Sequence, residues 1–339
     1  MMDLYIFILI SIILNLIIYF NFEFIAKKIN IFDSPDKKRK FHKNPISNIG
    51  GLIILINIIY FYSLFFFEIN FLEKNAYFQS FSQFFSFFIC LIPLAIIGIW
   101  DDKFYLSANT KTLLICIIIL IALYFDKELQ ITKLNFSFLD ETILLSNFSI
   151  LFTLVSIFLF MNALNMMDGI NLLTGFYSLL LLIILAIFSQ FSIIIFFIII
   201  GLITYLILNF NNRVFLGDSG SIILSYVISY FFIKSYNYEM SFYADQIFLI
   251  MLIPGIDLFR VAILRILSGK NPLKADRMHL HHLLAHFFSF EKTIIIILLL
   301  ISTPIILNIF LNLTLPLIII SLVTYLVLIF YVSKKLGSN

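Results

Sequence analysis

Runs of about 20 apolar residues recur along this chain and leave little room between them. A run of that length suffices for a helix to cross the hydrocarbon core of a membrane. Hydrophobic residues make up 62% of the 339 residues, and charged residues make up only 12%. A soluble domain of this size does not have such a composition. The sequence therefore predicts an all-α polytopic membrane protein with one transmembrane domain over residues 1–339.

The apolar runs divide into about eleven predicted transmembrane helices joined by short connections. Their predicted bounds are 3–22, 49–67, 81–100, 111–125, 146–164, 170–189, 191–209, 219–236, 244–262, 293–311 and 314–333. Cys90 and Cys116 both lie inside apolar runs. We interpret them as small buried hydrophobic residues rather than as a disulfide or a metal site.

The basic residues indicate how the helices are oriented. All but four of the 22 lysines and arginines fall on the side of the membrane that holds residues 23–48. Basic loops remain in the cytoplasm, so we expect the N-terminus outside and the C-terminus inside. The predicted cytoplasmic loops are about 23–48, 101–111, 210–218 and 263–292.

Five polar clusters fall at predicted helix boundaries on this cytoplasmic side, and one of them, the basic segment 37–43, is itself part of the charge pattern that indicates the topology. Ionisable groups in a membrane chain are costly and mark candidate functional sites. The clusters are Asp101–Asp102 and the segments 162–169, 217–220, 279–282 and 37–43.

Asp101 and Asp102 end the third predicted helix. Adjacent carboxylates repel each other unless they are solvated, paired with Lys103 or Lys111, or neutralised by a divalent cation. A solvated helix end is the simpler interpretation of this pair alone. Lys111 starts the next predicted helix and could reach the same surface to hold a phosphate, or extend to the interface as long basic side chains do.

The segment 162–169, with the sequence NALNMMDG, ends the fifth predicted helix. Asn162, Asn165 and Asp168 are three residues apart, so they lie on one stripe of a helix. Such a stripe suits ligand oxygens and the polar edge of a sugar or base. Hydrogen bonding between helices explains the same asparagines equally well.

The segment GDSG at 217–220 opens the eighth predicted helix. Asp218 and Ser219 are favoured residues for capping a helix N-terminus. The same geometry allows a carboxylate to hold Mg²⁺ against a phosphate, because a helix N-terminus favours anions.

Four of the five histidines lie within the eight residues 279–286, and the fifth, His42, lies in a basic loop. If the segment is helical, His279, His282 and His286 share a face. A zinc site is one interpretation, although no cysteine accompanies the histidines. The other is a set of donors that binds a diphosphate together with Arg277 and Lys274. The basic loop around His42 is also explained by attraction to anionic lipid headgroups.

Taken together, these segments resemble the polyprenyl-phosphate N-acetylhexosamine-1-phosphate transferase family, in order, spacing and topology over most of the chain. The matching positions are residues 33–45, Gly50–Gly51, Asp101–Asp102, Asn162, Asn165, Asp168, Gly169, Gly217–Asp218, His279, His281 and His282.

The resemblance implies an enzyme of the bacterial inner (cytoplasmic) membrane with its active site on the cytoplasmic face. It would transfer HexNAc-1-phosphate, by default GlcNAc-1-phosphate, from a UDP-sugar to undecaprenyl phosphate and release UMP. Mg²⁺ would be required, with Mn²⁺ as a substitute. Membrane lipids are further expected partners, a homodimer is compatible with the family, and no nucleic acid is expected.

The resemblance also implies roles for individual residues. Asp218 would be the principal metal ligand, with Asn165 beside it. Asp101 and Asp102 would lie near the lipid phosphate, and Lys111 would hold phosphate oxygens. The remaining implied residues are Asp168 and Asn171 near the nucleotide, Arg277, His279, His281 and His282 over the diphosphate, and Asn162 and His42 in substrate binding.

Three positions depart from the family pattern. Asn171 stands in place of an acid, Leu172 in place of a glycine, and Ile115 in place of a glutamine. The histidine segment also lacks the acidic residue that follows it in the branch acting on the peptidoglycan pentapeptide precursor. This difference favours the branch that initiates O-antigen, teichoic acid or related glycans.

Two other function classes remain at this point. A secondary transporter would place charges near the bilayer midplane and show inverted repeats; here the acids lie at helix ends and no repeat is evident. A non-catalytic scaffold of a glycan assembly complex is kept open by the altered nucleotide motif.

Overall fold

The computed structural model describes residues 2–33, 45–67, 81–189, 192–272 and 277–337. Most of these residues are helical, and the strands among them are four two-residue segments. Each predicted transmembrane segment falls on one helix, which confirms the all-α class. By length and composition, eight of the described helices could cross a membrane. The protein is therefore a multi-pass membrane protein, while the number of eleven crossings and the orientation stay predictions.

Residue contacts divide the chain into two compact units, which are described separately. Unit one comprises residues 1–127 and 178–231, and unit two comprises residues 128–177 and 232–339.

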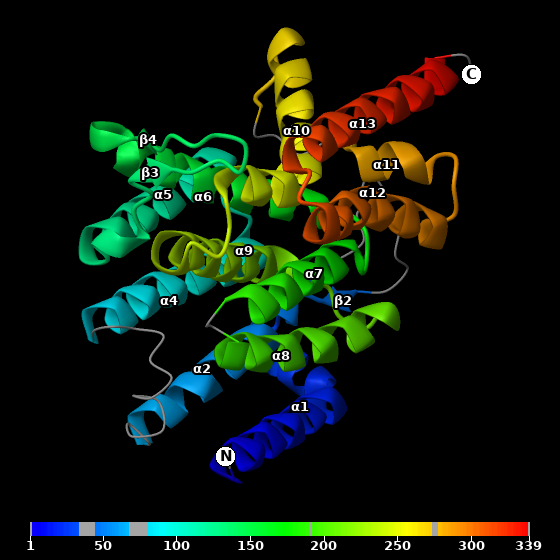
Figure 1. Ribbon diagram of the computed structural model, residues 1–339. Helices are drawn as coiled ribbons and strands as arrows, with labels where there is room; N and C mark the ends of the chain where they lie inside the picture. Colours follow the sequence, from blue (N-terminus) through cyan, green and yellow to red (C-terminus); the bar gives the residue numbers. More distant parts are fainter. Residues whose placement is uncertain (1, 34–44, 68–80, 190–191, 273–276, 338–339) are drawn as a thin grey trace. The chain divides into compact units, whose positions relative to one another are not determined.

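Unit one contains α1, α2, α4, α5, α8 and most of α7 and α9. In it, α2 lies along α8 and α4 packs against α5 (Figure 1). Within this unit α9 is buried from Ser219 onward. The bounds are α1 Met2–Ile29, α2 Gly50–Phe67, α4 Phe81–Phe104, α5 Ala108–Phe125, α7 Leu173–Phe188, α8 Ser192–Phe210 and α9 Gly217–Lys234.

Polar side chains fasten α1 to α2 within the apolar interior of unit one. The Asn15 amide donates to Asn57 Oδ1 over 2.7 Å, and the Asn57 amide donates back to Asn15 Oδ1 over 3.1 Å. Ser11 also donates to Asn57 Oδ1, at 3.2 Å. Interhelical hydrogen bonds of this kind stabilise helix association in an apolar medium.

A short antiparallel ribbon and a backbone ladder place the start of α9 beside the start of α2. The strands β1 (Phe32–Asp33) and β2 (Ile46–Ser47) pair with each other. The Phe215 N–H donates to Ser47 O over 2.8 Å, and the Gly51 N–H donates to Leu216 O over 3.1 Å. A Cβ on Gly51 would collide with the backbone of Gly220. Only glycine permits this close approach of the two helix starts.

Unit two is organised around α10, which packs against α6, α12 and α13. Two antiparallel strands, β3 and β4, lie in the connection before α6. The bounds are η1 Lys127–Leu129, β3 Lys133–Leu134, β4 Ile143–Leu144, η2 Ser146–Phe148, α6 Ser149–Met167, π-helix η3 Ser235–Glu239, α10 Ala244–Leu267, α11 Leu280–Ala285, α12 Phe290–Leu311 and α13 Thr314–Gly337.

Several helices run past their predicted ends. The helix α4 continues to Phe104, so the two aspartates lie in its last turn instead of after it. The helix α11 is short and begins at Leu280, with extended backbone at His279. A face shared by His279, His282 and His286 therefore does not form, because His279 precedes the helix.

Candidate functional site

The predicted acidic residues of unit one gather around a single lysine. Lys111 Nζ lies 2.8 Å from Asp101 Oδ2 and also forms an ion pair with Asp218. The Ser107 hydroxyl accepts from the Thr110 N–H at the start of α5, which places Lys111 in the first turn. The prediction that Lys111 reaches the surface of the acidic pair is confirmed.

Asp102 is used differently, because it caps the N-terminus of α9. Its two carboxylate oxygens accept from the backbone N–H of Asp218 at 2.8 Å and of Ser219 at 3.0 Å. The Asn48 amide also donates to Asp102, at 3.3 Å. The first N–H groups of a helix have no partner within the helix, and an anion there is favoured by the helix dipole. Asp102 thus orients the turn that carries Asp218.

Gly217 permits this arrangement. Its φ is +75°, and a Cβ there would lie 2.7 Å from Asp102 Oδ2. Any other residue would have to adopt a disfavoured backbone conformation and push the carboxylate away. The adjoining Ser219 hydroxyl is buried and finds no hydrogen-bond partner among the described residues.

Unit one places three carboxylates beside a single lysine. This excess of negatively charged oxygen ligands suits a hard cation. Asp218 is the most accessible of the ion-paired groups, with its side chain 33% exposed against 10% for Asp101. Among the described residues, no group of three histidine, cysteine or acidic side chains could hold a metal ion unaided. Mg²⁺ commonly takes only one or two protein carboxylates and completes its shell with water and substrate phosphates. The residues therefore fit Mg²⁺ better than zinc.

In unit two, the end of α6 meets the histidine segment. Met166, Met167, His279 and His281 line one pocket, together with apolar residues of α10 and α12. A Cβ on Gly169 would collide with the His281 ring. The predicted polar stripe thus lies next to the predicted histidines.

The polar residues of this stripe differ in their surroundings. The Asn162 amide donates to Phe158 O of its own helix over 2.8 Å, which favours a structural role for it. Asp168 is the C-cap of α6. Asn165, Asp168 and Asn171 are half-buried.

The buried histidines share the pocket but have different partners. His279 Nδ1 lies 2.8 Å from Asp257, and the rings of His279 and His281 stack 5.9 Å apart. His281 Nε2 is buried with no hydrogen-bond partner in the described part of the chain. Burial, reinforced by the neighbouring imidazoles, holds the pKa of His281 well below its usual range. His281 is therefore a neutral ring with one polar atom left for a ligand.

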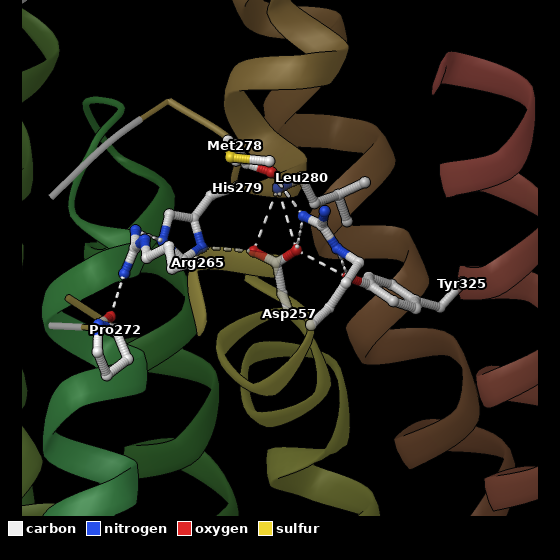
Figure 2. Close-up of polar contacts among 8 residues, drawn as sticks. Asp257, Arg265, Pro272, Met278, His279, Leu280 and Tyr325 are labelled. Atoms are coloured by element: carbon white, nitrogen blue, oxygen red, sulfur yellow. Dashed lines mark hydrogen bonds and ion pairs between the residues drawn. The ribbon is translucent and has the colours of Figure 1, made fainter. Parts of the chain in front are cut away.

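Sequence reasoning did not single out Asp257, which Figure 2 shows at the centre of the contacts around His279. A signal was present, because an acid within the apolar run IPGIDLF is costly in a membrane helix. Asp257 was not predicted because it lies inside a predicted helix and the candidate residues were taken from helix ends.

The predicted site residues thus form one group in each unit. Unit one brings together Asp101, Asp102, Lys111 and Asp218. Unit two brings the end of α6 together with the histidines, and Arg277 lies on the segment that leads into them. His42 and Lys274 lie outside the described residues. A common site formed by both groups, including Asn165 as a metal ligand, stays a prediction.

Comparison with known proteins shows which protein family this sequence resembles. The model of glycosyl transferase family 4 matches residues 84–236, which include the whole acid cluster of unit one. Over these residues the chain is similar to glycosyl transferase family 4. This result confirms the resemblance to the polyprenyl-phosphate N-acetylhexosamine-1-phosphate transferases.

Several curated relatives of this chain are named for the same activity. The undecaprenyl-phosphate alpha-N-acetylglucosaminyl 1-phosphate transferase of Salmonella typhi is 27% identical over 277 residues, 76% of this chain and 70% of the relative. That of Escherichia coli K12 is 27% identical over 272 residues, covering 77% and 70%. A probable undecaprenyl-phosphate N-acetylglucosaminyl 1-phosphate transferase of Bacillus subtilis is 27% identical over 288 residues, covering 80% and 75%.

Two departures of this chain from the expected family pattern have a structural counterpart. Leu172, in place of the expected glycine, has a φ of +68°. The backbone therefore keeps the left-handed conformation that glycine favours. Ile115 is buried one turn beyond Lys111 on α5, so an apolar contact stands where a glutamine was expected.

Proposed function

We propose that this protein transfers N-acetylglucosamine 1-phosphate from UDP-GlcNAc to undecaprenyl phosphate, releases UMP, and requires Mg²⁺. Its family and its curated relatives support the transfer of a sugar 1-phosphate to undecaprenyl phosphate. The observation that carries the proposal is Lys111, held between Asp101 and Asp218 at the start of α9.

The reaction joins two anions. An oxygen of the lipid phosphate bonds to the phosphorus that carries the sugar, and the bond from that phosphorus to the bridging oxygen of UMP breaks. A phosphate monoester has a second pKa of about 6, so the attacking oxygen is largely ionised near neutral pH. A strong general base is then unnecessary, and the barrier is mainly charge repulsion.

The residues of unit one address that repulsion in distinct ways. Lys111 is the cation that would contact phosphate oxygens. Asp102 orients the first turn of α9 through its hydrogen bonds to that turn. Asp101 accepts from the Leu106 N–H over 2.7 Å and shares Lys111, so it orients the lysine.

Asp218 is the residue that would hold Mg²⁺, or Mn²⁺ in its place. A divalent ion bound there would neutralise charge on the phosphates. In unit two, His281, His282 and Arg277 would hold the UDP-sugar, with Asp168 and Asn171 near the nucleotide. The close approach of the His281 and His282 rings to Gly169, at the end of α6, supports this assignment.

The excess of basic residues around the predicted cytoplasmic loops supports an active site on the cytoplasmic face of the bacterial inner membrane. The nucleotide sugar would then enter from the cytoplasm, and the undecaprenyl phosphate from the lipid. The product, a lipid diphosphate sugar, would initiate a cell-surface glycan such as O-antigen or teichoic acid.

An assay with purified protein tests the proposal. The protein in detergent is given radiolabelled UDP-GlcNAc, undecaprenyl phosphate and Mg²⁺, and lipid-linked sugar and UMP are measured. We expect both products in equal amounts, and neither with EDTA or with the Asp218→Asn variant. Parallel reactions with other UDP-HexNAc donors identify the preferred sugar. Folded protein that transfers no sugar from any of these donors would contradict the proposal.

A further inference from the structure

Asp257 is a buried carboxylate in the membrane helix α10, only 8% exposed. An ionised side chain in such a place is tolerated when several groups satisfy it. Its Oδ1 lies 2.8 Å from the Arg260 guanidinium and accepts from the Tyr325 hydroxyl at 2.7 Å. Its Oδ2 lies 2.8 Å from His279 Nδ1 (Figure 2). One carboxylate thus connects α10, α13 and the segment that begins α11.

The same network holds the backbone on both sides of His279. The Leu280 N–H donates to Asp257, 3.1 Å from Oδ2 and 3.2 Å from Oδ1. The Arg260 guanidinium, oriented by the Tyr325 hydroxyl at 2.8 Å, donates to Met278 O over 2.6 Å. The residues before and after His279 are therefore fixed to α10.

Both ring nitrogens of His279 are engaged inside the protein. Arg265 lies 3.3 Å from Nε2, and a guanidinium can only donate. Nε2 is then the acceptor and Nδ1 carries the proton that is donated to Asp257. Because His279 is also buried at 4% exposure, it has no ring nitrogen left for a ligand.

The position of His281 depends on that of His279. His281 stacks on His279 with the two rings only 5° from parallel, and its Nε2 has no hydrogen-bond partner among the described residues. His282 adjoins His281, with ring centroids 4.1 Å apart. A change in the direction of the His279 ring would move the ring stacked on it.

We propose that Asp257 is a positioning residue, which fixes His279 so that His281 and His282 face the UDP-sugar. The proposal rests on the proposed function and deepens it: His279 acts through its neighbours, and Tyr325 on the last helix supports the donor site through Asp257. For histidines that ligate a metal, removal of the partner that orients the ring costs about 10- to 100-fold in affinity or activity, and we expect a loss of the same order here.

The test compares Asp257→Asn with Asp245→Asn, a matched change on the same helix. Asp245 is also buried and accepts from the Ser137 N–H over 2.9 Å. It lies 12 residues, or about 18 Å, along α10 from Asp257. We expect Asp257→Asn to raise the KM for UDP-GlcNAc about 10- to 100-fold and to leave the KM for undecaprenyl phosphate unchanged. Asp245→Asn should change neither constant, whatever it does to thermal stability.

A second readout does not need activity. With ring-¹⁵N-labelled histidine, assigned by replacing each of the five histidines in turn, wild type should show His279 protonated on Nδ1. Asp257→Asn should shift the His279 and His281 signals, and Tyr325→Phe should shift them less.

The outcomes separate the two proposals. If wild type transfers no sugar, the proposed function fails, and the NMR spectra alone then decide the role of Asp257. Unchanged His281 signals in Asp257→Asn, or a donor KM equal to that of wild type, would overturn the positioning role. Equal changes of donor KM in both variants would do the same, since they would reflect a general loss of packing.

Discussion

Asp102 and Asp218 are close in space, but their surroundings predict different consequences of mutation. The oxygens of Asp102 are taken by backbone N–H groups, whereas the side chain of Asp218 is 33% exposed beside Lys111. We expect Asp102→Ala to lower the free energy of unfolding by about 2 kcal/mol, because buried N–H groups lose their partner. Asp218→Asn should change stability by less than about 1 kcal/mol, yet lower kcat at least about 100-fold. Chemical denaturation and initial rates measure both effects. Equal stability losses in the two variants would refute the distinction.

Lys111 shields Asp218 before any cation is present, so its removal should affect metal affinity and turnover in opposite directions. In Lys111→Met, Asp101 and Asp218 lose their common counter-ion, and Mg²⁺ binding should tighten. Turnover should fall at least about 100-fold, because a donor to the phosphates is gone. Mn²⁺ binding followed by electron paramagnetic resonance measures the first effect without catalysis. Weaker Mn²⁺ binding in the variant would show that Lys111 helps to build the cation site instead of competing with it.

Leu172 has a backbone conformation that costs a non-glycine residue about 1–2 kcal/mol. Leu172→Ala removes most of the side chain and keeps this strain, whereas Leu172→Gly removes both. We therefore expect the glycine variant to be more stable than the alanine variant by about 1 kcal/mol. At ordinary positions the order is reversed, since glycine loses more entropy on folding. Thermal unfolding of the two variants decides the matter; an alanine variant that equals or exceeds the glycine variant rules out strain at this position.

The sequence allowed the prediction of residues whose charge is energetically unfavourable in a membrane. Asp101, Lys111 and Asp218 stand out because a charge beside an apolar run needs a reason, and the structure places the three together. The capping role of Asp102 could not be predicted, because its partner N–H groups lie 116 and 117 residues further along the chain. The division of work between His279 and His281 was equally hidden, since it depends on which ring faces Asp257.

At the scale of elements, the helices were predictable because an apolar segment in lipid must satisfy its backbone within itself. Helix ends were less predictable: α1 continues seven residues beyond its predicted end, to Ile29. Charged side chains near a helix end can extend to the membrane interface, so the hydropathy of the sequence drops before the helix itself ends. The β3–β4 hairpin gives no pattern strong enough to detect, because each strand has only two residues.

The contact between the starts of α2 and α9 can be tested by adding a single methyl group at Gly51. Gly51→Ala would place a Cβ against the backbone of Gly220, so α9 must shift with the carboxylate contacts at its N-terminus. We expect activity to fall at least about 10-fold, since small displacements of a site are costly. Gly255→Ala on α10 is the matched control, because no atom of the described residues lies within 4 Å of a Cβ there. Initial rates at equal amounts of folded protein give the comparison. Equal rates in both variants would mean that the α2–α9 contact does not control the site.

For the whole molecule, the strongest inference from sequence is orientation, because it depends on where the lysines and arginines fall rather than on any single contact. A cytoplasmic active site requires the loop before α9 to face the cytoplasm and the loop before α6 to face outward. Asn211 and Asp140 are exposed residues in these two loops. Cysteines placed there report the side directly, once Cys90 and Cys116 are replaced by alanine.

We expect a membrane-impermeant maleimide to label Asp140→Cys on spheroplasts and to label Asn211→Cys only after the membrane is permeabilised. Detergent-solubilised protein should be labelled at both positions, which shows that each thiol is reactive. The reverse pattern would place Asp218 and its first helical turn outside the cell, where the membrane separates them from cytoplasmic UDP-sugars. In that case the acid cluster could not act on a nucleotide donor, however well its residues suit phosphate chemistry.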